Sequence, residues 1–177
     1  MGPTGRSRIL QIHPTRLCNL RCLHCYSSSG PEERGQLAPA LLRSVLTGAC
    51  AEGFTVAGFS GGEPVLYPPL GEVLDHAKGL GMITTVTSNG MLLDERRLAT
   101  LAGRTDVLAI SLDGVRRSGI PFGFIFTLTQ FNLDELPWVA SFALAQGAAL
   151  LQIHPLEITG RAAATLADAR PDGTESS

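Results

Sequence analysis

Short apolar runs alternate with longer segments of helical periodicity along most of the chain. The short runs are rich in Ile, Val, Thr and Phe, which is typical of strands buried in a parallel sheet. We expect six such strands, at residues 8–14, 54–60, 82–88, 107–113, 121–129 and 149–155. Between them the pattern predicts helices over residues 39–53, 68–81, 94–103 and 133–147. This alternation predicts an α/β fold, a parallel sheet or barrel with helices outside it.

One connection is shorter than this fold requires. After "VLAISLDG" only the six residues "VRRSGI" precede the fifth apolar run. Parallel neighbours need a crossover of roughly a dozen residues or more, usually a helix. Either the fourth and fifth strands pair unusually, or one helical unit is missing after Gly114. We favour the second interpretation, a missing fourth helix.

Composition predicts one globular domain. The chain has 177 residues, of which 44% are hydrophobic, enough for a packed core. We expect an N-terminal tail at 1–7, a core domain at 8–160, and a disordered tail at 161–177, where apolar periodicity is lost. The net charge of −2 gives no sign of a nucleic-acid or anionic-membrane partner.

The cysteine content and the N-terminal sequence bear on location. Neither a signal peptide nor a membrane span is expected, because no apolar run is long enough. We therefore expect a soluble cytoplasmic protein with reduced thiols. In that compartment a tight cysteine cluster favours a metal or redox site over a disulfide framework.

Three of the four cysteines lie within "CNLRCLHC", at Cys18, Cys22 and Cys25. This spacing lets three thiolates surround one centre, whereas Cys50 falls in a predicted helix and is interpreted as a small buried residue. A zinc site completed by His13 or His24 is one alternative, although a fourth zinc ligand normally arrives in a second pair. An iron–sulfur cluster with one iron left open is the other.

The cysteines share a predicted rim with other unusual segments. Ligands gather at the carboxyl ends of parallel strands. The cysteines follow the first strand, and the segments that follow the second, third, fourth and sixth strands are "SGGEP" (60–64), "TSNG" (87–90), "SLDG" (111–114) and "HPLE" (154–157). We therefore expect them to form one site.

These motifs resemble a known family. "CNLRCLHC" is similar to the C-x3-C-x-φ-C signature of the radical S-adenosylmethionine (radical SAM) enzymes, with His24 in the φ place. "GGEP" resembles their second hallmark, and "TSNG" and "ISLDG" resemble the segments that follow it. The resemblance spans roughly residues 8–160, and "TRLCNLRCLHCY" looks most like the branch that modifies peptides, proteins and tetrapyrroles.

The resemblance implies a fold and a chemistry. The fold would be a partial (β/α)6 TIM-like barrel of parallel strands with outer helices, lacking the fourth helix. Cys18, Cys22 and Cys25 would bind a 4Fe-4S cluster whose open iron takes the amino and carboxylate groups of SAM. With an electron from a flavodoxin or ferredoxin, SAM would be cleaved to a 5′-deoxyadenosyl radical that abstracts hydrogen from an unidentified peptide, tetrapyrrole or small molecule.

The resemblance also implies contacts with SAM. Gly61 and Gly62 would let the backbone approach its methionyl end, and Glu63 or nearby carbonyls would accept from its ammonium group. Pro64 would fix the turn. The remaining candidates are Ser111 and Asp113 for the ribose or carboxylate, His24 for the adenine, and Asn89 as either a turn residue or a hydrogen-bonding rim residue. No catalytic residue is assignable.

Departures from the family produce the alternatives. The missing fourth helix and the ending soon after the sixth strand predict a shortened member without the further cysteines that bind auxiliary clusters. The leading hypothesis is a radical SAM enzyme. A truncated, non-catalytic iron–sulfur protein is the second, and a structural zinc protein is the third.

Overall fold

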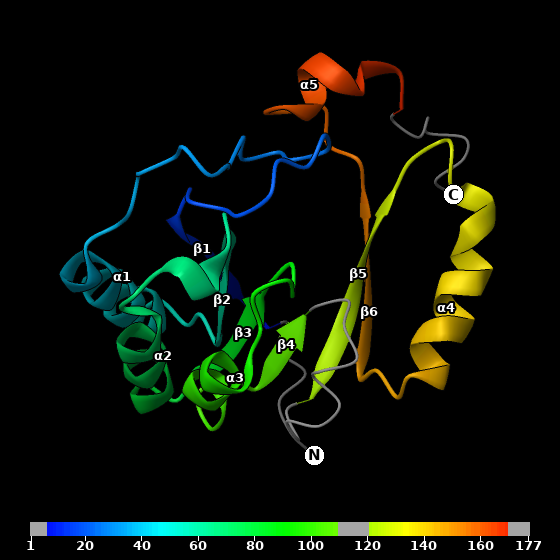
Figure 1. Ribbon diagram of the computed structural model, residues 1–177. Coiled ribbons are helices and arrows are strands. Elements are labelled where there is room, and N and C mark those ends of the chain that lie inside the picture. Colours follow the sequence, from blue (N-terminus) through cyan, green and yellow to red (C-terminus); the bar gives the residue numbers. More distant parts are fainter. Residues whose placement is uncertain (1–6, 110–120, 170–177) are drawn as a thin grey trace.

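The computed structural model describes residues 7–109 and 121–169. Within these residues six parallel strands form one sheet in chain order (Figure 1). They are β1 (Ile9–Thr15), β2 (Val56–Gly61), β3 (Ile83–Thr87), β4 (Val107–Ala109), β5 (Phe122–Leu128) and β6 (Leu150–Pro155). All five neighbouring pairs are parallel, so the predicted α/β fold with a partial TIM-like barrel is confirmed. β1 and β6 are the two edges of the sheet.

Helices cover the outer face of the sheet, as the sequence predicts. They are α1 (Pro39–Ala51), α2 (Leu70–Gly79), α3 (Glu95–Leu101) and α4 (Leu136–Ala145), with a short 3-10 turn η3 (Leu133–Glu135) before α4. In Figure 1, α1, α2 and α3 lie beside the first four strands and α4 beside β5 and β6. Leu46 of α1 and Leu74 of α2 are fully buried with Phe59 of β2 and Val86 of β3, so the core lies between the helices and the outer face of the sheet.

The short connection joins strands that are direct neighbours. Leu108 pairs with Phe122 and Ala109 with Gly123 in parallel register, and the Leu108 amide donates to the Pro121 carbonyl. β4 and β5 therefore pair although only residues 110–121 connect them. The predicted absence of a fourth helix concerns residues 110–120, which lie outside the described residues, as does the end of the strand predicted at 107–113.

The predicted disordered tail at 161–177 is wrong for residues 161–169. The chain forms helix α5 (Ala162–Thr165) and a 3-10 turn η4 (Ala167–Ala169) there. Ala162 and Ala169 are buried against Leu156, and the Gln130 amide donates to the Ala169 carbonyl at 3.1 Å. This segment is ordered by contacts with distant parts of the chain, which local periodicity does not reveal. Residues 170–177 lie outside the described residues.

Among the described helices, none combines the length and the apolar character needed to cross a membrane.

Asp106 joins α2 to the sheet beside β4. Its carboxylate accepts from the Lys78 ammonium at 2.6 Å, the Thr84 amide at 2.8 Å and the Thr84 hydroxyl at 3.1 Å. Burial acts to raise the pKa of Asp106, but these donors outweigh it, so the pKa lies below its ordinary value. A carboxyl with a lowered folded pKa contributes stability above its unfolded pKa, and this contribution is lost as the pH falls.

Asp106→Ala is expected to lower the free energy of unfolding at pH 7 by about 1–3 kcal/mol, because it leaves the Thr84 amide without its acceptor. The difference from the parent chain should narrow below about pH 4, as the carboxyl protonates. Urea unfolding at pH 7 and pH 3 measures both effects. Asp75→Ala is the matched control, since Asp75 meets Arg104 in an exposed pair of the kind that contributes about 0–1 kcal/mol. An equal loss in both variants would contradict the assignment.

Candidate functional site

The three clustered cysteines lie on one loop that leaves the end of β1, here called the cysteine loop (residues 16–30). Its two ends are tied together, because the Cys18 amide donates to the Gly30 carbonyl at 3.2 Å and the Gly30 amide to the Arg16 carbonyl at 3.3 Å. A turn between the second and third cysteines is closed by the Cys25 amide, which donates to the Cys22 carbonyl at 3.2 Å. The C-x2-C spacing therefore brings two thiols onto one tight turn.

Hydrogen-bond donors lie near the sulfur atoms of the first and the third cysteine, Cys18 and Cys25. The Leu20 amide lies 3.4 Å from the Cys18 Sγ, and the Asn89 Nδ2 lies 3.7 Å from the same atom. The Ser27 hydroxyl lies 3.4 Å from the Cys25 Sγ. Donors to sulfur are a means by which proteins tune thiolate-bound iron–sulfur clusters. The surroundings of the thiols therefore suit thiolate ligands.

The thiols also influence each other electrostatically. Burial is the largest influence on Cys22 and raises its pKa, and the neighbouring charges of Cys18 and Cys25 raise it further. Burial also acts to raise the pKa of Cys25, but hydrogen bonds from Ser27 and the Ser29 amide outweigh it, so the pKa is lowered. Arg161 lowers the pKa of both thiols. Negative charge on Cys18 or Cys25 opposes ionisation of Cys22, so a cationic centre beside these sulfur atoms would favour the thiolate form of Cys22.

The other candidate metal ligands do not lie beside the three thiols of the cysteine loop. Within the described residues, no three His, Cys, Asp or Glu side chains are grouped so as to hold a metal ion. His13 is not directed to the thiols, since its Nε2 lies 2.8 Å from the Tyr26 hydroxyl, and His24 is exposed. Cys50 lies in α1, where its thiol donates to the Leu80 carbonyl. In chemical type the three thiols of this loop suit an iron–sulfur cluster, whereas neither histidine is placed as a fourth zinc ligand beside them.

The "GGEP" motif packs against the start of the cysteine loop. The Gly62 amide donates to the Thr15 carbonyl at 2.9 Å, and the Glu63 amide donates to the Leu17 carbonyl at 2.8 Å. A Cβ on Gly62 would lie 2.3 Å from the Leu17 carbonyl oxygen, and Gly61 has a φ of 99°. Both positions thus need glycine for the local fold. Their predicted approach to SAM remains a prediction.

Glu63 is fully buried and ties two strand ends together. Its carboxylate accepts from the Asn89 amide at 2.8 Å and from the Val65 amide at 3.3 Å. Burial raises the pKa of this carboxyl, and the hydrogen bonds from Asn89, Ser88 and Val65 oppose the rise. The side chain thus stabilises the turn from within the protein, and the contact of Glu63 or nearby carbonyls with the SAM ammonium stays a prediction. Pro64 begins the 3-10 turn η1 (Pro64–Leu66) and is buried, consistent with fixing the turn.

Asn89 connects the end of β3 to the cysteine loop. Its Nδ2 donates to the Asn19 side chain at 2.9 Å and approaches the Cys18 sulfur, while its Oδ1 accepts from the Met91 amide at 3.0 Å. It is thus both a turn residue and a hydrogen-bonding rim residue, the two alternatives left open by the sequence.

The structure brings most, but not all, of the predicted site residues together. The cysteine loop, "GGEP" and "TSNG" meet on one rim, as the parallel strands predict. His24 lies on the cysteine loop with its side chain exposed, and its contact with adenine stays a prediction. Ser111 and Asp113 lie outside the described residues.

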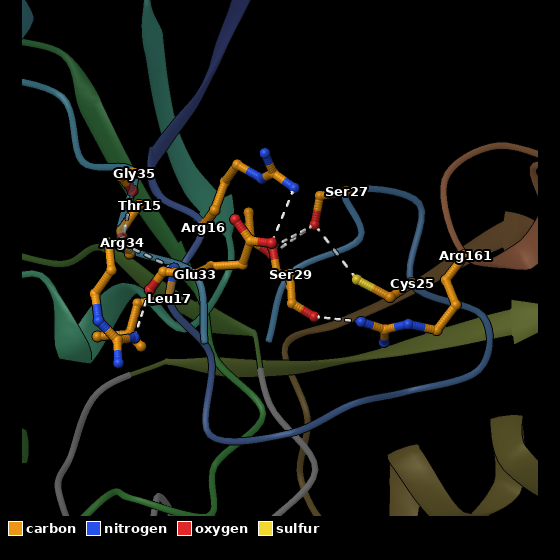
Figure 2. Close-up of polar contacts among 11 residues, drawn as sticks. Thr15, Arg16, Leu17, Cys25, Ser27, Ser29, Glu33, Arg34, Gly35 and Arg161 are labelled. Atoms are coloured by element: carbon orange, nitrogen blue, oxygen red, sulfur yellow. Dashed lines mark hydrogen bonds and ion pairs between the residues drawn. The ribbon is translucent and has the colours of Figure 1, made fainter. Parts of the chain in front are cut away.

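Sequence reasoning missed Arg161, which lies against the cysteine loop. Figure 2 shows its guanidinium pointing at the loop beside Ser29, with Cys25, Ser27 and Ser29 in one line of polar contacts. Arg161 donates to the Cys22 carbonyl at 2.7 Å across a separation of 139 residues. No local signal identifies this contact, because Arg161 falls where apolar periodicity ends.

A second polar group that the sequence did not reveal lies on β1 and β2. The Tyr26 hydroxyl bonds to His13 and lies 3.4 Å from the Ser60 hydroxyl, to which the Gln11 amide group donates at 2.7 Å. Burial lowers the pKa of His13, which favours the neutral imidazole. This group places uncharged hydrogen-bonding side chains next to the cysteine loop.

Comparison with known proteins decides the family. Residues 12–139 match the sequence profile described as the Radical SAM superfamily. The chain belongs to this superfamily. Its sequence is 28% identical to Fe-coproporphyrin III synthase from Methanosarcina barkeri, over 70% of this chain and 37% of that protein. It is 34% identical to GTP 3',8-cyclase from Chlorobaculum tepidum, over 61% of this chain and 33% of that protein.

Solved structures with the same fold extend the comparison. The structure of Streptococcus suis SuiB bound to the precursor peptide SuiA superposes with a TM-score of 0.71 at 18% identity, over 86% of this radical SAM chain and 40% of SuiB. The structure of anSMEcpe with bound AdoMet and the Kp18Cys peptide gives a TM-score of 0.66 at 18% identity, over 86% of this chain and 52% of anSMEcpe. These likenesses show the fold. The matched parts span about a third of the length of the curated relatives that are named above (37% and 33%).

Proposed function

We propose that this chain is a radical SAM enzyme whose Cys18, Cys22 and Cys25 bind a 4Fe-4S cluster. When bound, the cluster supplies the electron for reductive cleavage of SAM to a 5′-deoxyadenosyl radical, which abstracts hydrogen from a substrate. One observation carries the proposal. The cysteine loop, "GGEP" and "TSNG" are joined on one rim through Asn89, which bonds to Glu63 and lies beside Cys18.

The roles that we propose for the chain follow from these contacts. The three thiolates hold iron, and the Leu20 amide, Ser27 hydroxyl and Asn89 side chain stabilise charge on sulfur. Glu63 holds the ends of β2 and β3 in register with each other. The backbone of "GGEP" then offers carbonyls to the ammonium group of SAM, and Ser111, Asp113 and His24 complete the SAM contacts.

The electron donor that we propose is a flavodoxin or ferredoxin, acting in the cytoplasm, where thiols stay reduced. The relatives carry names from tetrapyrrole and nucleotide chemistry, and SuiB was solved with a precursor peptide. Because these substrates differ, the shared step, SAM cleavage, is the one that we assign. The substrate itself is proposed as a peptide, a tetrapyrrole or a small molecule.

Anaerobic reconstitution with iron and sulfide tests this function. We expect about four irons per chain and formation of 5′-deoxyadenosine after addition of SAM and dithionite. Iron uptake without SAM cleavage would instead support a non-catalytic iron–sulfur protein. Zinc binding without iron uptake would support a structural zinc protein and overturn the proposal.

A further inference from the structure

The segment that follows β6 closes onto the cysteine loop. We call residues 160–165 the clasp. Within it, Arg161 donates from Nη1 to the Cys22 carbonyl and from Nη2 to the Ser29 carbonyl, each at 2.7 Å. Its own amide donates to the Cys25 carbonyl at 3.0 Å. One residue thus holds three carbonyls of the loop, two of them on cysteines that we propose as iron ligands.

Two further features of the clasp show that this contact is built and not incidental. The Thr165 hydroxyl donates to the Leu23 carbonyl at 2.8 Å. Gly160 has a φ of 56°, and a Cβ there would lie 2.1 Å from the Tyr26 carbonyl oxygen. Only glycine allows this backbone to come so close to the loop.

The clasp is itself anchored to the far edge of the sheet. Ala162 is fully buried in a small cluster with Leu156, and the Leu156 amide donates to the Leu128 carbonyl at the end of β5. In Figure 1, α5 lies above the end of β6 and next to the loop that leaves β1. The clasp therefore links the two edge strands of the sheet at the rim that carries the cysteines.

We propose that Arg161 is a positioning residue for the iron–sulfur cluster: it restrains the cysteine loop through the carbonyls of Cys22 and Ser29, so that the three thiols can converge on the cluster. This inference rests on the proposed function. Three thiolates on one loop repel each other, so the loop gains from fixation before iron arrives. A planar guanidinium suits this task, because its two nitrogens reach two carbonyls at a fixed angle. Its positive charge also lies beside the ligands.

The inference is tested with Arg161→Ala and Arg161→Lys in the whole chain, with Arg104→Ala as the matched control. Arg104 bonds to Asp75 and to the Thr100 carbonyl on the outer helices, away from the rim. Without iron, hydrogen exchange of the amides between residues 22 and 29 should become at least about tenfold faster in Arg161→Ala, since local opening becomes easier. Arg104→Ala should leave these rates unchanged.

The second readout is iron itself. Arg161→Ala should weaken iron binding roughly 10- to 100-fold, as loss of an outer-shell partner does at other metal sites. It should also lower the midpoint potential of the cluster, because a positive charge is removed. Arg161→Lys keeps the positive charge but loses the pair of guanidinium nitrogens that donate to two carbonyls. We therefore expect it to show an intermediate affinity and a potential close to that of the parent.

Each result has a distinct meaning. Parent-like exchange and iron affinity in Arg161→Ala would overturn the positioning role, whereas the proposed function would stand. Full recovery of both readouts in Arg161→Lys would overturn the two-carbonyl mechanism. Failure of the parent chain to take up iron would refute the proposed function, and loop exchange without iron would still test the clasp. If Arg161→Ala loses its far-ultraviolet circular dichroism, it has not folded. Hydrogen exchange of the loop and iron affinity in Arg161→Lys then test the positioning role.

Discussion

Cys22→Ala is expected to abolish iron uptake by the reconstituted chain, whereas Cys50→Ala is expected to leave it unchanged. With only Cys18 and Cys25 left on the loop, a cluster would have two protein ligands in place of three. The change is specific to the thiol, because alanine keeps the carbonyl through which residue 22 accepts from Arg161. Iron and sulfide content and visible absorption after anaerobic reconstitution measure the result.

Cys50 provides the control within the same chain. Its thiol lies in α1, donates weakly to the Leu80 carbonyl and packs at the edge of the core. Its replacement by alanine should cost about 1 kcal/mol of stability and none of the iron. Equal loss of iron in both variants would contradict the ligand assignment. So would retention of about four irons by Cys22→Ala.

The fold was largely predictable because its signals are local. Apolar runs such as the one containing Phe59 mark strands, and each predicted strand and helix has a counterpart among the described residues. The parallel arrangement then follows from the helices between the strands. This places Cys18, Glu63 and Asn89 on one rim without further information.

The missed features depend on contacts between residues far apart in the chain. Arg161 lies in a segment of small and polar residues that is ordered by contacts with distant parts of the chain, among them its own bonds to the cysteine loop. The surroundings of Glu63 were not predictable for a related reason. Its position in a motif indicates a ligand contact, but only the packed structure shows that its carboxylate is buried and bonded to backbone amides.

The need for glycine in "GGEP" also depends on contacts between residues far apart in the chain, and replacing Gly62 should have a large effect on stability. Gly62→Ala is expected to lower the free energy of unfolding by about 3 kcal/mol, at the upper end of the usual cost of overpacking. Its Cβ would lie 2.3 Å from the Leu17 carbonyl oxygen and 2.9 Å from the Arg16 carbonyl carbon. Both are backbone atoms, so no side chain can rotate away to relieve the clash. Urea unfolding of the iron-free chain measures this cost.

The displaced backbone directly precedes the first cysteine, so the same substitution should impair the site. The Leu17 carbonyl also accepts from the Glu63 amide, and moving it breaks the contact that holds "GGEP" against the cysteine loop. We therefore expect lower iron uptake in Gly62→Ala even below its unfolding temperature. Gly48→Ala in α1 is the matched control. Nothing lies within 4 Å of its added Cβ, and removing glycine from a helix interior should raise stability by about 0.5–1 kcal/mol. Parent-like stability and iron content in Gly62→Ala would show that the close approach of the two backbones is not needed for the fold or for the site.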